Sequence, residues 1–263
     1  MPRRRAGRER SSPPPASATR STRTPRPTPT GARSCAGPST RPCPRSPPSS
    51  PASRSTPTAS AGAWSVAECV ELFDRAQHAG HPVRVHADQF NPLGLVPEAV
   101  ARGYRSVDHL EATTPDDLHA LAASDTFGVV LPCAGFHTDG RYGDGRAFLD
   151  AGGRLAIATN TNPGSAPCQS MPMAIALAAR HNGLTPAEAI ACATATPAAL
   201  LGLTDRGRIE PGCRADLVLL RHTDERALAF EFGGDPTDLV VCGGQMIKML
   251  KTVKEVGTIN QAD

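Results

Sequence analysis

The 263-residue sequence has no long apolar run, no CxxC motif and no histidine before His78. Without a run of about 18 apolar residues, the sequence predicts no membrane-spanning helix. It also shows no apolar core of a signal peptide. The eight cysteines are scattered along the chain, which disfavours a zinc site built on cysteine pairs. Scattered cysteines are typical of reduced thiols, and the sequence therefore predicts a cytoplasmic protein.

Acidic residues are nearly absent from residues 1–60, where Glu9 is the only one. This segment holds 12 of the 28 basic residues, all of them arginine, and 14 of the 26 prolines. It therefore carries a net charge of +11, whereas residues 61–263 carry −8. Because residues 1–60 have almost no large apolar side chain to bury, they cannot offset the conformational entropy lost on folding. We expect this segment to be disordered.

Three origins fit the composition of residues 1–60. Dense arginine suits nucleic-acid binding, but no aromatic residue is interleaved, so nucleic acid is the disfavoured partner. An organelle transit peptide is also rich in arginine and poor in acids, although prolines would break its amphipathic helix. We favour the third origin, a translated GC-rich stretch from a misassigned start or a shifted reading frame upstream of a genuine domain.

Regular hydrophobic spacing begins at Trp64. The segment "SVAECVELFDRAQHAG" predicts a helix that starts at Ser65, with Glu68 three residues later, and stops at Gly80. Short apolar strands are then predicted to end near positions 86, 109, 131 and 159, each followed by a helix. Their period of roughly 22 to 28 residues is the length of one strand–helix unit in a parallel sheet. Four such units predict an α/β fold in which residues 61–205 form half of a (β/α)8 barrel of the TIM type.

Two further helices and a small β-appendage are predicted after the fourth strand. The segments "SMPMAIALAARHNG" and "LTPAEAIACATATPAALLG" each predict one helix, the second starting at Thr185 and Pro186. A strand over residues 215–220 and another over residues 238–248, with a turn at Gly243 and Gly244, predict strands of a C-terminal appendage. Residues 206–263 make up this third part of the chain.

Polar side chains gather where the four predicted strands end. In (β/α)8 barrels the reactive groups lie at the carboxyl ends of the strands, although strand ends are also polar simply because they are exposed. Imidazole and carboxylate are the usual ligands of a catalytic metal ion, which makes His86 a candidate ligand or else an ordinary hydrogen-bonded histidine. His109 could polarise a carbonyl or merely form a hydrogen bond to its neighbour Asp108 or to Glu111. The strand-end residues are His86, Asp88, Gln89, Asp108, His109, Glu111, Asn160 and Asn162.

Five segments together resemble imidazolonepropionase, a metal-dependent member of the amidohydrolase superfamily. They are "VHADQF", "SVDHLE", "AIATNTNPGSAPCQSMPMAIALA", "LTPAEAIACAT" and "GRIEPGCRADLVLL". The resemblance covers roughly residues 63–248 and implies a (β/α)8 barrel with a β-sandwich formed by both chain ends, usually a homodimer. It also implies one zinc or iron ion, whose water opens the ring of 4-imidazolone-5-propanoate to give N-formimidoyl-L-glutamate in histidine degradation.

The resemblance assigns a role to each matching position. It implies that His86 binds the metal, that His109 is the catalytic histidine and that Gln89 contacts the substrate. It also places Asn160 where the family has a metal-binding aspartate. The residues that it implies hold substrate or product are Asn162, Gly164 and Ser165.

Two departures from the family pattern separate the competing hypotheses. The family has a His-x-His pair on its first strand, and no histidine precedes His78 here. The amide of Asn160 is a weaker ligand than a carboxylate and cannot take up a proton. The sequence therefore supports an imidazolonepropionase-like hydrolase, with an inactive truncated or frameshifted fragment of that enzyme as the alternative. A basic-tailed binding protein is the weaker third hypothesis.

Overall fold

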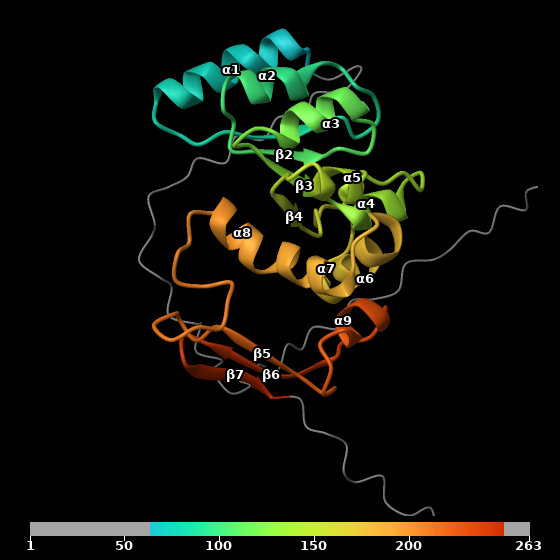
Figure 1. Ribbon diagram of the computed structural model, residues 1–263, viewed down its shortest axis with the longest axis vertical. Helices are drawn as coiled ribbons and strands as arrows, with labels where there is room; N and C mark the ends of the chain where they lie inside the picture. The colour runs from blue at the N-terminus through green and yellow to red at the C-terminus, as the bar shows by residue number, and fades with distance from the viewer. Residues whose placement is uncertain (1–63, 250–263) are drawn as a thin grey trace, which may run out of the picture. The chain divides into compact units, whose positions relative to one another are not determined.

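The computed structural model of the chain describes residues 64–249, so the expectation of disorder in residues 1–60 lies outside the described residues. Helices and strands alternate through the first part of this range (Figure 1). The elements are α1 (Val66–His78), β1 (Arg84–Ala87), α2 (Leu95–Ala101), β2 (Ser106–His109), α3 (Pro115–Ala122), β3 (Phe127–Val130), α4 (Pro132–His137), α5 (Gly145–Asp150) and β4 (Leu155–Ile157).

The four strands form one parallel sheet in the order β1-β2-β3-β4. In Figure 1, α2 and α3 lie side by side, and they contact β1, β2 and β3. This arrangement confirms the α/β class and the repeated strand–helix units of half a barrel. Because all four strands run in the same direction, their carboxyl ends lie along one edge of the sheet. We call residues 86–89, 109–111 and 158–165 at these ends the carboxyl edge.

Local capping signals explain where the helices begin. Ser65 and Glu68 form a capping box at α1, in which each side chain bonds to the backbone of the other residue. Thr114 caps α3 by accepting a hydrogen bond from the Asp117 amide, and Pro115 occupies the first turn. Each cap satisfies amides that have no partner within the helix, worth about 1 kcal/mol. The helix α1 starts where the sequence predicts, with Ser65 as its cap.

The core packs α5 directly onto the sheet. The ring of Phe148 is fully buried against two glycines, Gly128 in β3 and Gly153 before β4. A Cβ atom would lie 2.9 Å from this ring at Gly128 and 2.5 Å from it at Gly153, closer than real side chains approach. The two glycines therefore make room for an aromatic side chain whose burial is worth about 1.5–3 kcal/mol.

The helices after β4 differ in part from the sequence prediction. The helix α6 (Met171–His181) forms as expected. The single helix expected over residues 184–202 divides into α7 (Pro186–Ala193) and α8 (Ala195–Leu200), because Thr194 leaves the helical region with φ −127° and ψ −75°. Both parts contact β4. Two short helices, α4 and α9 (Ala227–Phe230), are not expected from the sequence.

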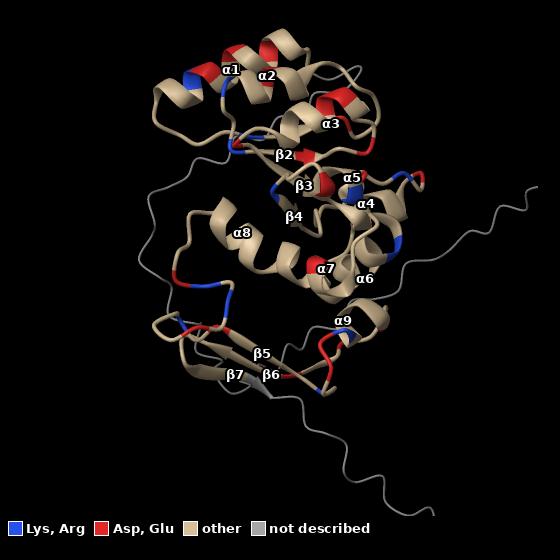
Figure 2. Cartoon of the chain, in the orientation of Figure 1, with Lys and Arg blue, Asp and Glu red and all other residues tan. Residues whose placement is uncertain are grey.

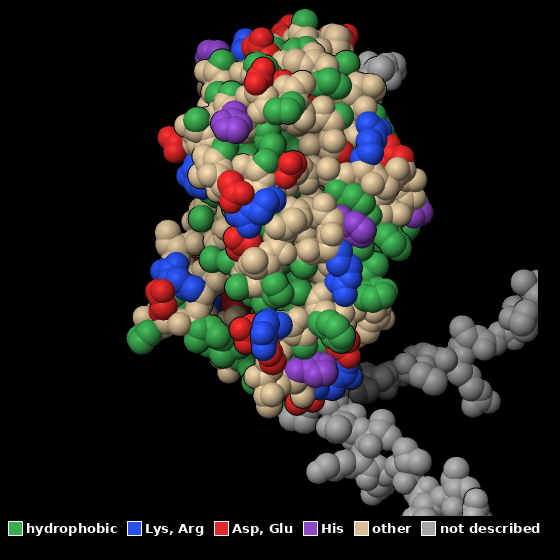
Figure 3. Space-filling view, turned by 45° about the vertical axis from the view of Figure 1, so that its right-hand side comes forward, with side chains coloured by type: hydrophobic (Ala, Val, Ile, Leu, Met, Phe, Trp, Pro, Cys, Tyr) green, Lys and Arg blue, Asp and Glu red, His purple; other side chains and the backbone are tan. Residues whose placement is uncertain are grey.

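The C-terminal part forms an antiparallel sheet of β5 (Leu217–Leu220), β6 (Thr237–Cys242) and β7 (Gln245–Met249). The predicted turn between the last two strands is present, with positive φ at both Gly243 and Gly244. Many of its apolar side chains are exposed, among them Val218 and Met246. Figure 3 shows hydrophobic side chains among charged ones in the lower part of the picture. A second sheet facing this one stays a prediction.

The described residues also bear on the expected chemistry of the surface. No helix within residues 64–249 is long and apolar enough to cross a membrane. Figure 2 shows acidic positions on α1, α2 and α3, with basic positions scattered singly rather than forming a stripe along a described helix. The expectation of reduced cysteines is met at Cys69, Cys133, Cys168, Cys192 and Cys213.

Candidate active site

Two of the predicted site residues, His86 and His109, lie against each other at the carboxyl edge. His86 is in β1 and His109 is the last residue of β2, one strand away. Their ring centroids are 5.1 Å apart, and the rings are tilted by 54°. The pairing register alone does not bring them together, because His109 lies opposite Ala87 rather than opposite His86.

The backbone of His109 explains this contact. Alternation along β2 assigns His109 to the same face as Val107, away from His86. His109 and the next residue, Leu110, have φ values of +100° and +72°. Such angles are strained for residues with a side chain and cost on the order of 1–3 kcal/mol each. They break the alternation at the strand end, and the imidazole turns toward His86.

Left-handed backbone is concentrated at this edge. Among the described residues, the non-glycine positions with positive φ are Asp88, His109, Leu110 and Asn160, and all four belong to the carboxyl edge. Strained backbone is typical of functional sites, where the surrounding structure fixes an unfavourable conformation. The strained backbone therefore lies at the same carboxyl edge to which the sequence assigns the candidate site residues.

His86 is held as a neutral imidazole. Burial lowers its pKa, and the neighbouring His109 and Arg84 act in the same direction, although the carboxylate of Asp108 partly opposes them. The Nδ1 atom of His86 is buried and has no hydrogen-bond partner among the described residues. A neutral ring with an unpartnered nitrogen is the form in which histidine binds a metal ion.

Asp108, which the sequence also places at a strand end, is occupied by other contacts. Its carboxylate accepts hydrogen bonds from Arg84 Nη2 at 3.0 Å and from Ser106 Oγ at 2.7 Å. Strand alternation puts Arg84, Ser106 and Asp108 on one face of the sheet, so this network ties β1 to β2. The role of Asp108 in the structure is therefore to hold the two histidine-bearing strands together.

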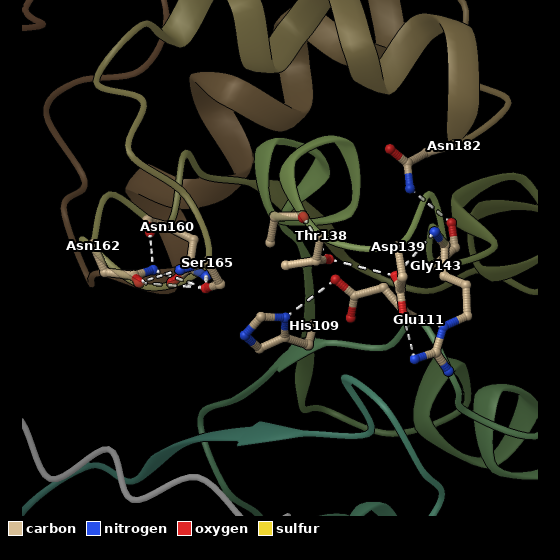
Figure 4. Close-up of polar contacts among 11 residues, drawn as sticks. His109, Glu111, Thr138, Asp139, Gly143, Asn160, Asn162, Ser165 and Asn182 are labelled. Carbon is tan, nitrogen blue, oxygen red and sulfur yellow. Dashed lines mark hydrogen bonds and ion pairs between the residues drawn. The ribbon is translucent and has the colours of Figure 1, made fainter. Parts of the chain in front are cut away.

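His109 forms its side-chain hydrogen bond with Glu111, not with Asp108. Its Nδ1 lies 3.1 Å from Oε1 of Glu111, as Figure 4 shows, and both side chains are almost completely buried, at 3% and 5% exposure. The second oxygen of Glu111, Oε2, is buried without a partner among the described residues. Of the two hydrogen bonds considered for His109 from the sequence, the structure forms the one to Glu111.

Asp88 and Gln89 add two unpartnered polar atoms at the end of β1. Asp88 accepts a hydrogen bond from Thr113 Oγ1 at 3.0 Å, but its Oδ1 is buried without a partner among the described residues. Burial raises the pKa of this carboxyl. The amide nitrogen of Gln89 is likewise buried and unpartnered. Gln89 therefore keeps a donor available, as a substrate contact requires.

The loop after β4 brings the predicted substrate-holding residues together in one turn. The side-chain oxygen of Asn162 accepts hydrogen bonds from the amides of Gly164 and Ser165, both at 2.8 Å. Its amide group donates to the Asn160 carbonyl at 2.6 Å and to Ser165 Oγ at 3.0 Å. The hydrogen bonds of the Asn162 side chain therefore lie within the loop and fix its conformation.

A metal ion would find only part of its ligand set in the described residues. His86 fits one ligand position, because its Nδ1 is buried and unpartnered. Residues 64–249 contain no group of three or more His, Cys, Asp or Glu side chains that could hold a metal ion. Asn160 could add only a neutral oxygen. Because zinc takes four ligands, the described residues do not complete a metal site by themselves.

Gly143 packs against the backbone of His109 and Leu110, and Asn182 bonds to Gly143. The sequence analysis did not identify either residue. A Cβ atom on Gly143 would lie 3.2 Å from the carbonyl oxygen of His109 and 3.3 Å from that of Leu110. The carbonyl of Gly143 accepts a buried hydrogen bond of 2.7 Å from the Asn182 side chain (Figure 4). No local signal predicts this contact, since the two residues are 39 positions apart and Asn182 reads as an ordinary helix cap.

Comparison with known proteins was made on sequence and on structure. The sequence profile described as "Amidohydrolase family" matches residues 22–247. Imidazolonepropionase of Herpetosiphon aurantiacus is 42% identical over 189 residues, which are 71% of this chain and 44% of that protein. Imidazolonepropionase of Deinococcus deserti is 44% identical over 174 residues, which are 66% of this chain and 44% of that protein. The chain thus spans about half the length of the curated relatives it matches.

Solved structures share the fold at lower sequence identity. An adenosine deaminase from Xanthomonas campestris, with bound zinc, matches with a TM-score of 0.57 at 21% identity, covering 72% of this chain and 51% of that one. A triazine hydrolase variant matches with a TM-score of 0.58 at 20% identity, covering 75% of this chain and 51% of that one. At this identity the likeness establishes the fold and nothing finer.

Proposed function

The chain belongs to the amidohydrolase family, and from that premise we propose that it is the ring-opening hydrolase for which its relatives are named, an imidazolonepropionase. Its substrate would be 4-imidazolone-5-propanoate, a small molecule, and its product N-formimidoyl-L-glutamate. The observation that carries the proposal is the contact of two buried imidazoles at the carboxyl edge, where His86 keeps an unpartnered Nδ1. The identity of 37–44% to imidazolonepropionases supports the choice of reaction within the family.

The proposal gives each residue of the carboxyl edge a role. His86 and Asn160 are the residues of this chain that would hold one zinc or iron ion, and such an ion supplies a water that is nucleophilic near neutral pH. Since the described residues do not complete the ligand set, further ligands have to come from outside residues 64–249. A homodimer in the cytoplasm is the assembly that the family resemblance favours.

His109 is the proposed catalytic residue. Its Nδ1 is bonded to Glu111, so the opposite nitrogen, Nε2, is the atom that can give or take a proton at the reacting oxygen. In Figure 4 the second nitrogen of the His109 ring lies on the side opposite Glu111. In the neutral ring Nε2 accepts a proton, and once protonated it would stabilise negative charge that develops on the ring carbonyl of the substrate.

The remaining site residues would hold the substrate. The unpartnered amide of Gln89 offers a donor whose burial would otherwise cost free energy. The turn formed by Asn162, Gly164 and Ser165 presents small polar groups suited to the propanoate carboxylate. Because Asn162 fixes the turn internally, the loop would meet the carboxylate with little further ordering.

A direct assay tests the proposal on the full chain. The purified protein is supplied with zinc or with ferrous iron and incubated with 4-imidazolone-5-propanoate, and N-formimidoyl-L-glutamate is quantified by mass spectrometry. We expect metal-dependent product formation that is lost in His86→Asn and retained in His119→Asn, a matched change at an exposed histidine on α3. The proposal fails if neither metal binds stoichiometrically and no product forms.

A further inference from the structure

The buried pair of His109 and Glu111 has a property that the proposed reaction has not yet used. The two residues are separated by Leu110 alone, and its left-handed backbone lets both side chains face each other. Their exposed fractions are 3% and 5%. A polar pair sealed from water in this way is costly unless its hydrogen bond is made, so its geometry is strongly fixed.

The chemistry of the two groups decides which ring nitrogen carries the proton. When the Glu111 carboxyl is ionised it can only accept hydrogen bonds, and in that state His109 Nδ1 is the donor in the 3.1 Å contact. In the neutral ring, Nε2 then carries the free lone pair. The nearest alternative acid, Asp108, cannot replace Glu111, because it is bonded to Arg84 and Ser106.

We propose that Glu111 is a positioning residue that holds His109 in the Nδ1–H tautomer and directs Nε2 toward the reacting atoms. Its effect on the reaction rests on the proposed function; its effect on the tautomer does not. Two contacts hold the imidazole: Glu111 bonds to Nδ1, and the ring centroid of His86 lies 5.1 Å away. Gly143 packs against the backbone carbonyl of His109. The unpartnered Oε2 of Glu111 leaves His109 as the side-chain partner that the structure gives this carboxylate.

Nitrogen NMR of the full chain, labelled with 15N-histidine and studied without added metal, tests the tautomer. The His109 resonances are assigned by their loss in His109→Asn. We expect the native protein, above the titration of its histidines, to show the Nδ1–H form, Glu111→Leu to lose it, and Glu111→Gln to shift the Nδ1 resonance. The control Glu71→Gln, at an exposed residue paired with Arg75 on α1, should leave the His109 resonances unchanged.

Rates supply the second readout. If the chain opens the imidazolone ring, Glu111→Gln should lower kcat about 10- to 100-fold, the range known for metal-binding histidines that lose their hydrogen-bond partner, with little change in KM. Where Glu111→Leu does not fold, as judged by circular dichroism, the Gln variant alone decides.

The two ideas fail in different ways. A chain without activity whose His109 tautomer responds to Glu111 would refute the proposed function and keep the positioning role. An active chain in which Glu111→Gln changes neither the His109 resonances nor kcat would overturn the positioning role. A native His109 in the Nε2–H form would overturn it as well, whatever the activity.

Discussion

Glu188 links α5 to α7, two helices that both contact β4, and its removal should lower the stability of the fold. Its carboxylate accepts hydrogen bonds from the Thr185 backbone amide at 2.8 Å and from the Thr185 hydroxyl at 2.9 Å, which completes the capping box of α7. Arg146 on α5 donates to both oxygens at 2.9 Å. One side chain therefore caps a helix and links it to a neighbour.

The contacts of Glu188 set the expected magnitude. The hydrogen bonds from Thr185 and Arg146 lower the pKa of this carboxyl from 4.5 to about 2. A fall of that size would be worth roughly 3 kcal/mol at full strength. Because the carboxylate is 34% exposed, solvent screens the interaction and we reduce the value to about 1.5 kcal/mol. A helix cap of about 1 kcal/mol and an exposed ion pair of about 0.5 kcal/mol give a similar figure.

Urea unfolding of the full chain and of Glu188→Gln at several pH values tests this prediction. At pH 7 we expect the variant to lose about 1.5 kcal/mol of unfolding free energy. A carboxyl whose pKa is lowered by folding contributes stability above its unfolded value of 4.5 and loses it as the pH falls toward its folded value of about 2. The difference between the two proteins should therefore close between these pH values.

The outcome that refutes this reasoning is a difference that stays constant with pH, or one that is absent at pH 7. The matched control is Glu225→Gln, at an exposed glutamate just before α9. It should change the unfolding free energy by less than about 0.5 kcal/mol at every pH. Equal losses in both variants would mean that the effect is one of general charge.

Two further predictions concern Asn160 and the buried thiol of Cys133. Asn160→Asp should tighten zinc binding on the order of tenfold, roughly 1.4 kcal/mol, because a carboxylate replaces a neutral amide; unchanged affinity by calorimetry would mean that residue 160 points elsewhere. Burial raises the pKa of the Cys133 thiol to about 12, and Cys168 adds to the rise, so at pH 8 only about one thiol in ten thousand is ionised. Iodoacetamide should label Cys133 slowly in the native chain and quickly in urea, as followed by mass spectrometry, and equal rates would contradict its burial.

Much of the fold could be predicted because its signals are local. The starts of α1, α3 and α7 follow from a capping residue and its partner three positions later, such as Ser65 with Glu68. The strands follow from short apolar runs at regular spacing. The helices α4 and α9, of six and four residues, could not be predicted in this way, because no side chain caps the first turn of either. The break at Thr194 does have a local signal, which the sequence analysis missed: Pro197 has no N–H to bond to the carbonyl of Ala193, as a continuous helix would require.

The sequence predicts which residues of the candidate site lie at strand ends, but not how their side chains are oriented. The sequence places His86 and His109 at the ends of neighbouring strands, and these two residues do meet. It does not reveal on which side His109 emerges, because that depends on left-handed backbone at two consecutive non-glycine residues. It leaves two partners open for His109, and the choice of Glu111 follows from Asp108 being bonded elsewhere.

The distribution of strain bears on how the carboxyl edge works. Four non-glycine residues there have positive φ, at a cost on the order of 1–3 kcal/mol each, and this cost has to be offset by packing and hydrogen bonds around them. Gly143 behind His109, the Asn182 bond to Gly143 and the internal turn of Asn162 are contacts of that kind. Each of these contacts is made between residues of the chain itself. The conformation of the edge is therefore set by the fold itself, and a ligand that binds there has less ordering to bring about, which favours both affinity and rate.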